Sequence, residues 1–527
     1  MSVQPLSKTL PDLVDEMAAR FPEREALVDG ERRYTYRQLQ QSIIDFARGL
    51  SSIGAGRGDK IAILMGNRAE WVISAIAATK VGGVALALNT WWTSREIAYA
   101  LNHAEARFIV CTPKYMKHDN VKALEGLRLD GALPWLQGIV GVGAPLPVPW
   151  FSWDALCMTG AQARFEPDRS APGPEDVAFL LYTSGSTSHP KAVPLIHRCL
   201  IENIWNIGER EKVTEHDRLW LAVSLFWGFG CSNALMNLLT HGGCIVLQES
   251  FDAAEALRLI EVERCSVIYG TPNMIQALAE HPDRASRDLS SLRTGATLGS
   301  PEQMKRAVAL GAHAICNLYG LTETYGNSHH SDAEDPIDLR IRSCGRPLPG
   351  TSQRIVHPET GLEMPIGGIG EIRIKGYVTT GYYKDSEQTA LAFDADGYFK
   401  TGDLGCVDEA GNLFFKGRLK EIVKSGGINV SPAEIEEVLM SHPDVRLAVV
   451  AGVPHPSRDE ILGAVIVLRD GRNPSEQEMR DFCRRQLAAY KVPVLIQFST
   501  EAAMPMTTTG KIQKNRIAST FFAVEQT

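Results

Sequence analysis

The residues best suited to chemistry lie between Tyr182 and Leu195, in the string YTSGSTSHPKAVPL. The apolar run VAFLL at 177–181 leads into this string in the manner of a buried strand. Four hydroxyl side chains then surround Gly185, and Lys191 follows a proline; the hydroxyl residues are Thr183, Ser184, Ser186 and Thr187. Successive backbone N–H groups, hydroxyl donors and a nearby ammonium form a cradle for a polyphosphate.

The loop is not of the Walker type, because the pattern GxxxxGK[ST] is missing. A P-loop NTPase is therefore not expected. The same composition also fits a Ser-rich surface turn without a ligand. The loop by itself leaves both interpretations open.

Five further stretches follow the loop along the chain. They are TGATL (294–298), NLYGLTE (317–323), TGD (401–403), GRLKEIVKSGG (417–427) and TTTGKIQK (507–514). Together with the loop, and in the same order, they resemble motifs of the adenylate-forming superfamily of AMP-dependent synthetases and ligases. The acyl- and aryl-CoA synthetase branch is the expected one. The resemblance covers nearly the whole chain.

This resemblance implies ATP, Mg²⁺ and coenzyme A as ligands. Glu323 and Thr187 would hold Mg²⁺, a hard cation that needs only one or two protein oxygens. The implied catalytic residues are Lys191, Thr322, Glu323 and Lys511, and Lys511 would bridge the substrate carboxylate and the α-phosphate. The implied cofactor-binding residues are Thr183, Ser184, Gly185, Ser186, Thr187, Gly295, Ala296, Thr297, Asn317, Tyr319, Gly320, Asp403, Arg418, Lys424, Gly426 and Gly427.

The resemblance also implies a rotation of the C-terminal domain after adenylation. Lys420 stands at the hinge position, and the rotation would exchange Lys511 for the face that carries Lys424 and the two glycines after it. Two loop positions depart from the family pattern, since Ser188 and Ala192 stand where glycines are usual. Neither change removes a charge or a donor, so only the path of the loop is affected.

The implied acid pocket consists of Trp227, Tyr269, Thr294, Leu318, Tyr325 and Gly326. Aromatic walls suit an aromatic, cyclic or medium-sized acid, although each aromatic side chain could equally belong to the core. No acidic residue stands near Phe226 to bind a substrate ammonium, which argues against an amino acid.

The expected function is an ATP-dependent carboxylic acid:CoA ligase that releases pyrophosphate and then AMP. One alternative keeps adenylation but delivers the acyl group to the phosphopantetheine of a carrier protein. Luciferase-like oxygenation has no support beyond kinship. A non-catalytic nucleotide-binding protein would be expected to lack Lys511 or Glu323, and both are present.

Alternating strand and helix patterns before residue 340 predict an α/β fold with parallel-sheet layers, closed by a β-rich subdomain. We expect a large domain over 1–417 and a small, mobile α+β domain over 418–527. In the small domain, Ser431-Pro432-Ala433-Glu434 predicts a capping box with proline at the first helical position, and Ser475 with Glu478 predicts another.

The composition limits the possible functions. The chain has 527 residues, 44% of them hydrophobic, and a net charge of -8, which gives no reason to expect nucleic acid as a partner. Ten scattered cysteines without CxxC pairs suit a reducing compartment. Without a signal-peptide pattern or an uninterrupted apolar span, a cytoplasmic protein with no integral membrane association is expected. The oligomeric state stays open between monomer and homodimer.

Overall fold

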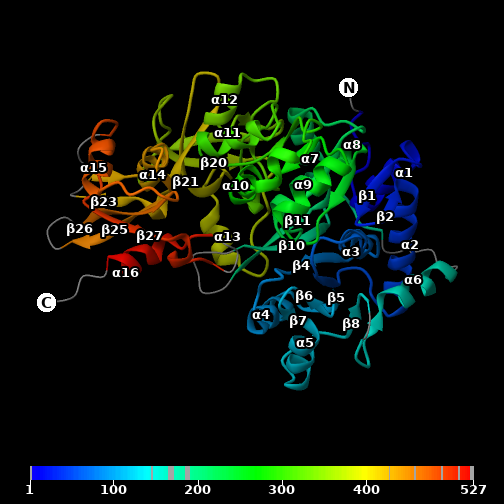
Figure 1. Cartoon of the computed structure of the whole chain (residues 1–527). Coiled ribbons are helices and arrows are strands. Elements are labelled where there is room, and N and C mark those ends of the chain that lie inside the picture. The colour runs from blue at the N-terminus through cyan, green and yellow to red at the C-terminus, as the bar shows by residue number, and fades with distance from the viewer. Residues whose placement is uncertain are drawn as a thin grey trace. The chain divides into compact units, whose positions relative to one another are not determined.

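The computed structural model describes residues 3–143, 146–163, 171–183, 190–425, 428–455, 459–487, 491–507 and 511–522. The chain forms two compact units (Figure 1). The first comprises Met1–Ser352 with Lys375–Gly397, and the second comprises Gln353–Ile374 with Tyr398–Thr527. The expected boundary between residues 417 and 418 concerns movement and stays a prediction.

A seven-stranded sheet carries the phosphate-loop strand of the first unit. Its order is β11 (Lys191–Ile196), β10 (Val177–Thr183), β4 (Val84–Ala87), β3 (Lys60–Leu64), β5 (Ala106–Cys111), β8 (Gly138–Gly141) and β9 (Phe151–Ser152). The strands pair in parallel except for β10 and β11, which are antiparallel. Their apolar runs are buried on both faces, as parallel sheets covered by helices require.

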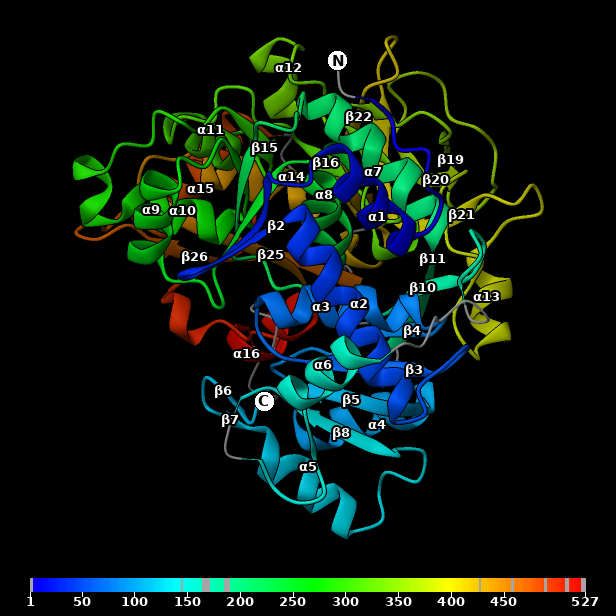
Figure 2. The same cartoon turned by 90° about the vertical axis from the view of Figure 1, so that its right-hand side faces the viewer.

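Helices cover both faces of this sheet. On one face lie α2 (Tyr36–Ser52) and α3 (Ala69–Lys80) (Figure 2). Their apolar side chains share one core with Ile61 and Ile63 of β3. On the other face, α4 (Ser94–Ala104) and α5 (Asn120–Leu129) pack against Ala62 and Leu64. The alternation of β3 side chains between two cores follows directly from the two-residue period of a strand.

A six-stranded sheet forms the other layer of this unit. Its order is β15 (Thr294–Ala296), β14 (Val267–Tyr269), β12 (Arg218–Leu221), β13 (Cys244–Leu247), β1 (Glu25–Asp29) and β2 (Arg32–Thr35). All pairs are parallel except β1 with β2. One continuous hydrophobic core joins this sheet, α3, α7 (His197–Glu211) and α8 (Met236–His241) to the inner face of the seven-stranded sheet.

Two further features of the first unit shape the site. A π-helical segment, Phe229–Leu235, runs directly into α8, and such widened turns occur frequently at functional sites. A small antiparallel sheet consists of β16 (Leu318–Tyr319), β17 (His329–His330) and β18 (Arg346–Pro347). It places the motif NLYGLTE beside the end of β15, where Ala296 bridges to Cys316.

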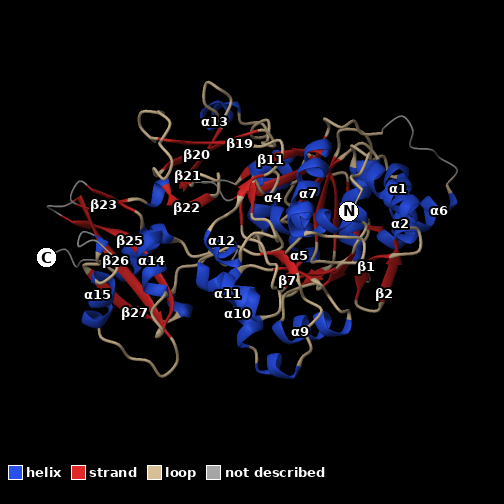
Figure 3. Cartoon of the chain, turned by 90° about the horizontal axis from the view of Figure 1, so that it is seen from above, coloured by secondary structure: helices blue, strands red, loops and turns tan. Residues whose placement is uncertain are grey.

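The second unit is rich in strands (Figure 3). An antiparallel sheet has the order β19 (Ser352–Val356), β20 (Gly370–Lys375), β21 (Phe399–Val407) and β22 (Leu413–Arg418). A second sheet orders β24 (Ile428–Val430), β23 (Val423–Ser425), β26 (Asp459–Leu468) and β25 (Val445–His455), with β27 (Leu495–Ser499) parallel to β26. Helices α14 (Pro432–Met440) and α15 (Glu476–Arg484) pack on it, and α16 (Ile517–Phe521) contributes to a second core.

The two predicted capping boxes have different outcomes. Ser475 and Glu478 form the expected reciprocal box at the start of α15. The box at Ser431 was wrong: α14 has proline at its first position, but Ser431 donates its hydroxyl to the Lys416 carbonyl instead. Glu434 pairs with Lys491 at 2.7 Å. The hydrogen bond to Lys416 O orients the Ser431 hydroxyl, and its oxygen accepts no backbone N–H of α14 as a cap would require.

Candidate active site

Tyr382 connects two of the predicted catalytic residues. Lys191 opens β11, so its backbone follows the phosphate loop, whose residues Ser184, Gly185, Ser186 and Thr187 lie outside the described ranges. The Lys191 ammonium lies 4.6 Å from the centre of the Tyr382 ring and donates to Gln388 Oε1 at 2.7 Å. The Tyr382 hydroxyl donates to Glu323 Oε1 at 2.9 Å. The ring of Tyr382 thus contacts the cation, and its hydroxyl contacts the carboxylate.

Glu323 lies in a tight turn that restrains it strongly. It is 9% exposed and belongs to the 3₁₀ turn Thr322–Thr324, and its carbonyl accepts from the Thr379 N–H at 2.7 Å. Burial and the neighbouring carboxylate raise the pKa of Tyr382 well above its usual value. The phenol therefore remains a donor to Glu323 throughout the physiological pH range.

The expected nucleotide wall is built on β15 and β16. Gly295 has a φ of +127°, and a Cβ there would lie 2.0 Å from the Ile268 carbonyl oxygen, so only glycine fits between the strands. Thr297 is buried and donates its hydroxyl to Gly270 O at 2.7 Å. Asn317 exchanges two hydrogen bonds with Ser331, at 2.9 and 3.0 Å. These contacts fix the backbone of TGAT beside that of NLYG.

The turn between Tyr319 and Gly326 is equally close-packed. The Tyr319 ring lies 5.9 Å from the His329 ring, in an edge-on arrangement. A Cβ on Gly320 would lie 2.0 Å from Gly326 O, and one on Gly326 would lie 1.6 Å from Asn233 Oδ1. Asn233 belongs to the π-helical segment, which therefore packs directly against the motif that carries Glu323.

An aromatic cluster contains the one partly exposed aromatic of the expected acid pocket. Trp227 is half-buried, and its ring meets those of Trp91 at 5.2 Å and Phe226 at 5.4 Å, both edge to face. A Cβ on the adjacent Gly228 would lie 3.7 Å from Thr322 Oγ1. The indole cluster thus adjoins the predicted catalytic turn. Trp91 was not predicted, because nothing in its spacing relates it to Trp227.

The other expected pocket residues lie deeper. Tyr269, Thr294 and Tyr325 are fully buried, and Leu318 is nearly so. The Tyr325 hydroxyl accepts from the Ile196 N–H at 3.2 Å, and the Tyr269 ring lies 5.3 Å from the half-buried Phe229 ring. The half-buried Phe229 ring therefore lies against the fully buried Tyr269 ring.

In the second unit, the predicted ribose pair is in contact. Asp403 on β21 lies opposite Arg418 on β22, and Arg418 Nε is 3.4 Å from Asp403 Oδ1. The carboxylate is buried, whereas the guanidinium is largely exposed. The cross-strand register brings together two residues that are fifteen positions apart in sequence (418 minus 403).

The remaining predicted residues also belong to the second unit. Lys511 closes a turn in which its N–H donates to Thr507 Oγ1 at 3.0 Å and its carbonyl accepts from Thr507 N–H at 2.7 Å. Lys420 lies in the 3₁₀ turn Leu419–Glu421, and Lys424 lies on β23. Gly426 and Gly427 lie outside the described residues.

Metal and membrane features are limited in the described ranges. There, no group of three or more His, Cys, Asp and Glu side chains could hold a metal ion. A Mg²⁺ ion that keeps its waters needs no such group, and the buried Glu323 carboxylate has the required chemistry. Nor does any helix of the described chain have both the length and the apolarity to cross a membrane.

Comparison with known proteins identifies the family. The sequence matches the AMP-binding enzyme family over residues 14–383 and the AMP-binding enzyme C-terminal domain over residues 434–511. The chain belongs to this family of adenylate-forming enzymes. It is an AMP-forming acid–thiol ligase of the acyl-CoA synthetase type, a class that uses ATP and CoA. The family and the fold class expected from sequence are both confirmed.

Three relatives illustrate the range of acids in the family. The chain is 31% identical to the mitochondrial medium-chain acyl-CoA ligase ACSF2 of Macaca fascicularis, over 97% of this chain and 87% of that protein. It is 32% identical to the 3-[(3aS,4S,7aS)-7a-methyl-1,5-dioxo-octahydro-1H-inden-4-yl]propanoyl:CoA ligase of Mycobacterium tuberculosis, over 97% and 98%. The crystal structure of the anthranilate CoA ligase AuaEII in complex with anthranoyl-AMP superposes with a TM-score of 0.87, at 27% identity and over 98% and 97%.

Proposed function

We propose that this protein is an ATP-dependent ligase that adenylates an aromatic, cyclic or medium-sized carboxylic acid and transfers the acyl group to CoA. The observation that carries the proposal is the contact chain Lys191–Tyr382–Glu323 at the end of the phosphate-loop strand. It holds a cation and a carboxylate beside the turn that contains Thr322. Charge stabilisation of this kind is what phosphoryl-centre chemistry requires of a protein.

In the first half-reaction, a carboxylate oxygen of the acid attacks the α-phosphorus, and the bond to the β-phosphate oxygen breaks. Lys191 and the loop 183–187 bind the departing pyrophosphate, and Thr322 contacts the α-phosphate. Asp403, with Arg418 beside it, accepts hydrogen bonds from the two ribose hydroxyls, since a carboxylate can accept both. Lys511 lies between the carboxylate and the α-phosphate. Mg²⁺, held by Glu323 and Thr187, would supply neutralisation of phosphate charge.

In the second half-reaction, the CoA sulfur attacks the acyl carbon and AMP leaves with the electrons of the C–O bond. The domain 418–527 turns at Lys420 and removes Lys511. Lys424, Gly426 and Gly427 then face the pantetheine, and the glycines permit its close approach. The rotation explains why one chain has two sets of basic residues for successive steps.

The aromatic cluster of Trp91, Phe226 and Trp227 supports the proposed substrate class. Flat apolar walls beside the catalytic turn favour a ring or a short hydrocarbon body. The relatives named for anthranilate, for an indene-ring propanoic acid and for medium-chain acids are consistent with a substrate of this size. The cellular location proposed is the cytoplasm.

A pyrophosphate-release screen over graded carboxylic acids, with and without CoA, tests the proposal. Turnover that requires both an acid and CoA is the expected result. If adenylation needs no CoA and the acyl group is then loaded onto the phosphopantetheine of a carrier protein, the acceptor is that carrier protein and not CoA. Absence of pyrophosphate release with every acid would contradict the proposal, provided that the protein binds ATP and melts cooperatively.

A further inference from the structure

A charged pair lies completely buried between the two halves of the candidate site. Glu211, the last residue of α7, and His330, the last residue of β17, both have fully buried side chains. Glu211 Oε1 lies 3.0 Å from His330 Nε2. His330 Nδ1 lies 2.8 Å from the Ser331 carbonyl oxygen, which can only accept, so Nδ1 carries a proton. The second ring nitrogen, Nε2, faces the Glu211 carboxyl group within ion-pair distance, but the geometry gives it no hydrogen bond within the described residues.

Stability alone does not account for such a pair. Removing two charges from water costs several kcal/mol each, and apolar side chains of similar size often stabilise a core equally well. The pKa of His330 is lowered by burial, but its Cys316 and Glu211 neighbours outweigh this effect and raise it to about 10. His330 therefore keeps its positive charge in the core at neutral pH. The contacts of the pair indicate what this charge does.

On one side, the Glu211 carboxylate holds the wall of the expected acid pocket. Tyr269 donates its hydroxyl to Oε1 at 2.6 Å. Asn237, on α8, donates to Oε2 at 2.9 Å and also to the Tyr269 oxygen at 3.1 Å. The Tyr269 ring in turn packs against the ring of Phe229, which belongs to the π-helical segment. The carboxylate thus determines where the tyrosine ring lies.

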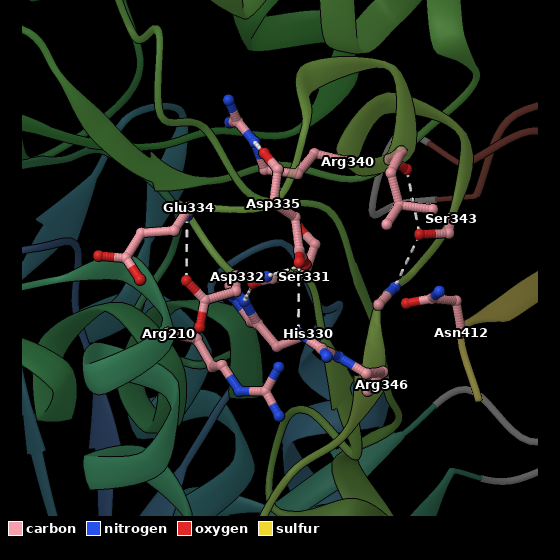
Figure 4. Close-up of polar contacts among 12 residues, drawn as sticks. Arg210, His330, Ser331, Asp332, Glu334, Asp335, Arg340, Ser343, Arg346 and Asn412 are labelled. Carbon is pink, nitrogen blue, oxygen red and sulfur yellow. Dashed lines mark hydrogen bonds and ion pairs between the residues drawn. The ribbon is translucent and has the colours of Figure 1, made fainter. Parts of the chain in front are cut away.

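On the other side, Glu211 contacts His330, and the adjacent Ser331 exchanges two hydrogen bonds with Asn317 of the expected nucleotide wall. His330 lies opposite Leu318 in the antiparallel register of β16 and β17. The hydroxyl of Thr294, the first residue of TGAT, donates to the backbone carbonyl of Glu211 at 2.9 Å. Figure 4 shows the segment from His330 to Asp335 beside Arg210 and Arg346. Ala333 N–H donates to Arg210 O at 2.8 Å, which anchors this segment to the end of α7.

We propose that Glu211 is a positioning residue that holds the acid wall and the nucleotide wall in one geometry, through Tyr269 on one side and His330 on the other. The inference rests on the proposed function, because that function gives the two walls their ligands. Glu211 itself touches neither ligand. Its effect is exerted through the side chains that it orients, and a change there alters the binding of both substrates together.

The test compares three conservative variants of the full chain. Glu211→Gln keeps the shape of the side chain but removes the charge opposite His330. Tyr269→Phe removes only the hydroxyl on the acid side. Tyr36→Phe is the matched control, because this equally buried tyrosine donates to a carbonyl, Gly243 O at 2.7 Å, outside the network. Pyrophosphate release measures KM for acid and ATP separately, and thermal melts measure stability.

Glu211→Gln should raise KM for the acid and for ATP, each by about tenfold, since it weakens the hydrogen bond from Tyr269 on one side and removes the ion pair with His330 on the other. Tyr269→Phe should raise KM for the acid alone, and Tyr36→Phe should lower the melting temperature without changing either KM. If Glu211→Gln lowers the melting temperature and leaves both KM values at those of Tyr36→Phe, the pair is merely structural and the inference is wrong.

Two further measurements keep the test decisive. If Glu211→Gln fails to fold, Tyr269→Phe and His330→Gln replace it, and the inference fails unless the first shifts the acid KM and the second the ATP KM. If the wild type releases no pyrophosphate with any acid, the proposed function has failed. Calorimetric titration with ATP then tests the nucleotide side without turnover: an unchanged dissociation constant in Glu211→Gln would contradict the inference, and weaker binding would support it.

Discussion

The Tyr382 hydroxyl donates a 2.9 Å hydrogen bond to Glu323 Oε1, and the face of the same ring lies 4.6 Å from the Lys191 ammonium. Two residues that the motifs predicted separately are thus held by a third that no motif singled out. Tyr382 therefore contacts both of the charged residues that the proposed mechanism assigns to the phosphates and to the metal ion.

Tyr382→Phe should reduce kcat at saturating ATP by about tenfold, because Glu323 loses a restraint worth about one charged hydrogen bond. The ring contact with Lys191 is kept, so KM for ATP should change little. Steady-state kinetics with ATP varied will show this. The control is Tyr383→Phe, whose ring lies against Lys60 and Lys384 instead. Equal kcat values in the two variants would contradict a role for the Tyr382 hydroxyl.

Glu323→Gln and Asp403→Ala should impair adenylation through different parameters. Glu323→Gln removes the charge proposed for Mg²⁺ and should mainly lower kcat at saturating ATP. Asp403→Ala removes the ribose acceptor and should mainly raise KM for ATP. Both variants are compared with wild type in pyrophosphate release at several Mg²⁺ concentrations. Wild-type parameters in both would show that neither assignment holds.

Lys511→Ala should separate the two half-reactions. Loss of one preorganised contact to developing charge costs about a hundredfold or more in rate, so ATP-dependent turnover should collapse. A supplied acyl-adenylate with CoA should still give thioester, because Lys511 has left the site in that step. Arg516→Ala, which removes a nearby exposed charge, serves as the control. Equal loss of both half-reactions in a folded variant would refute the exchange of domain faces.

Trp227→Ala should change the choice of acid more than the stability. A fully buried tryptophan such as Trp71 costs about 3–5 kcal/mol on truncation to alanine, whereas the half-buried Trp227 should cost less. The variant should lose kcat/KM on the preferred acid and gain relative activity on bulkier acids. Measurements over a graded acid series, beside thermal melts of Trp71→Ala, decide the matter. A steep loss of stability with an unchanged ranking would make Trp227 a core residue.

The His330 charge predicts a pH dependence of stability. Burial lowers the pKa of His330, but Cys316 and Glu211 raise it further, to about 10 from an ordinary value of 6.5. Because the folded pKa is raised, the stabilising contribution is complete below about pH 6.5 and decreases until it vanishes near pH 10. Urea unfolding of wild type and His330→Gln at pH 6.5, 8 and 9.5 should show a shrinking difference. A difference that stays constant or grows with pH would mean that His330 is neutral in the folded state.

The sequence alone determined the family and the class of chemistry. It also predicted the residues of the proposed site, because phosphate binding and ribose binding need particular side chains at short, local spacings. It also predicted the parallel α/β layers, since apolar strand runs alternate with amphipathic helices. The local pattern failed at Ser431, whose hydroxyl is oriented by a tertiary hydrogen bond to Lys416 O and does not accept from its own helix.

Only the tertiary structure decided which side chains support the site. Tyr382 meets Glu323 from 59 positions away, Trp91 meets Trp227, and Glu211 joins Tyr269 to His330. No spacing rule relates these residues, because the sheet order and the crossing of α7 between two sheets bring them together. The sequence around a single tyrosine or glutamate does not reveal its role. That role depends on how deeply the side chain is buried and on which partners the fold brings into contact with it.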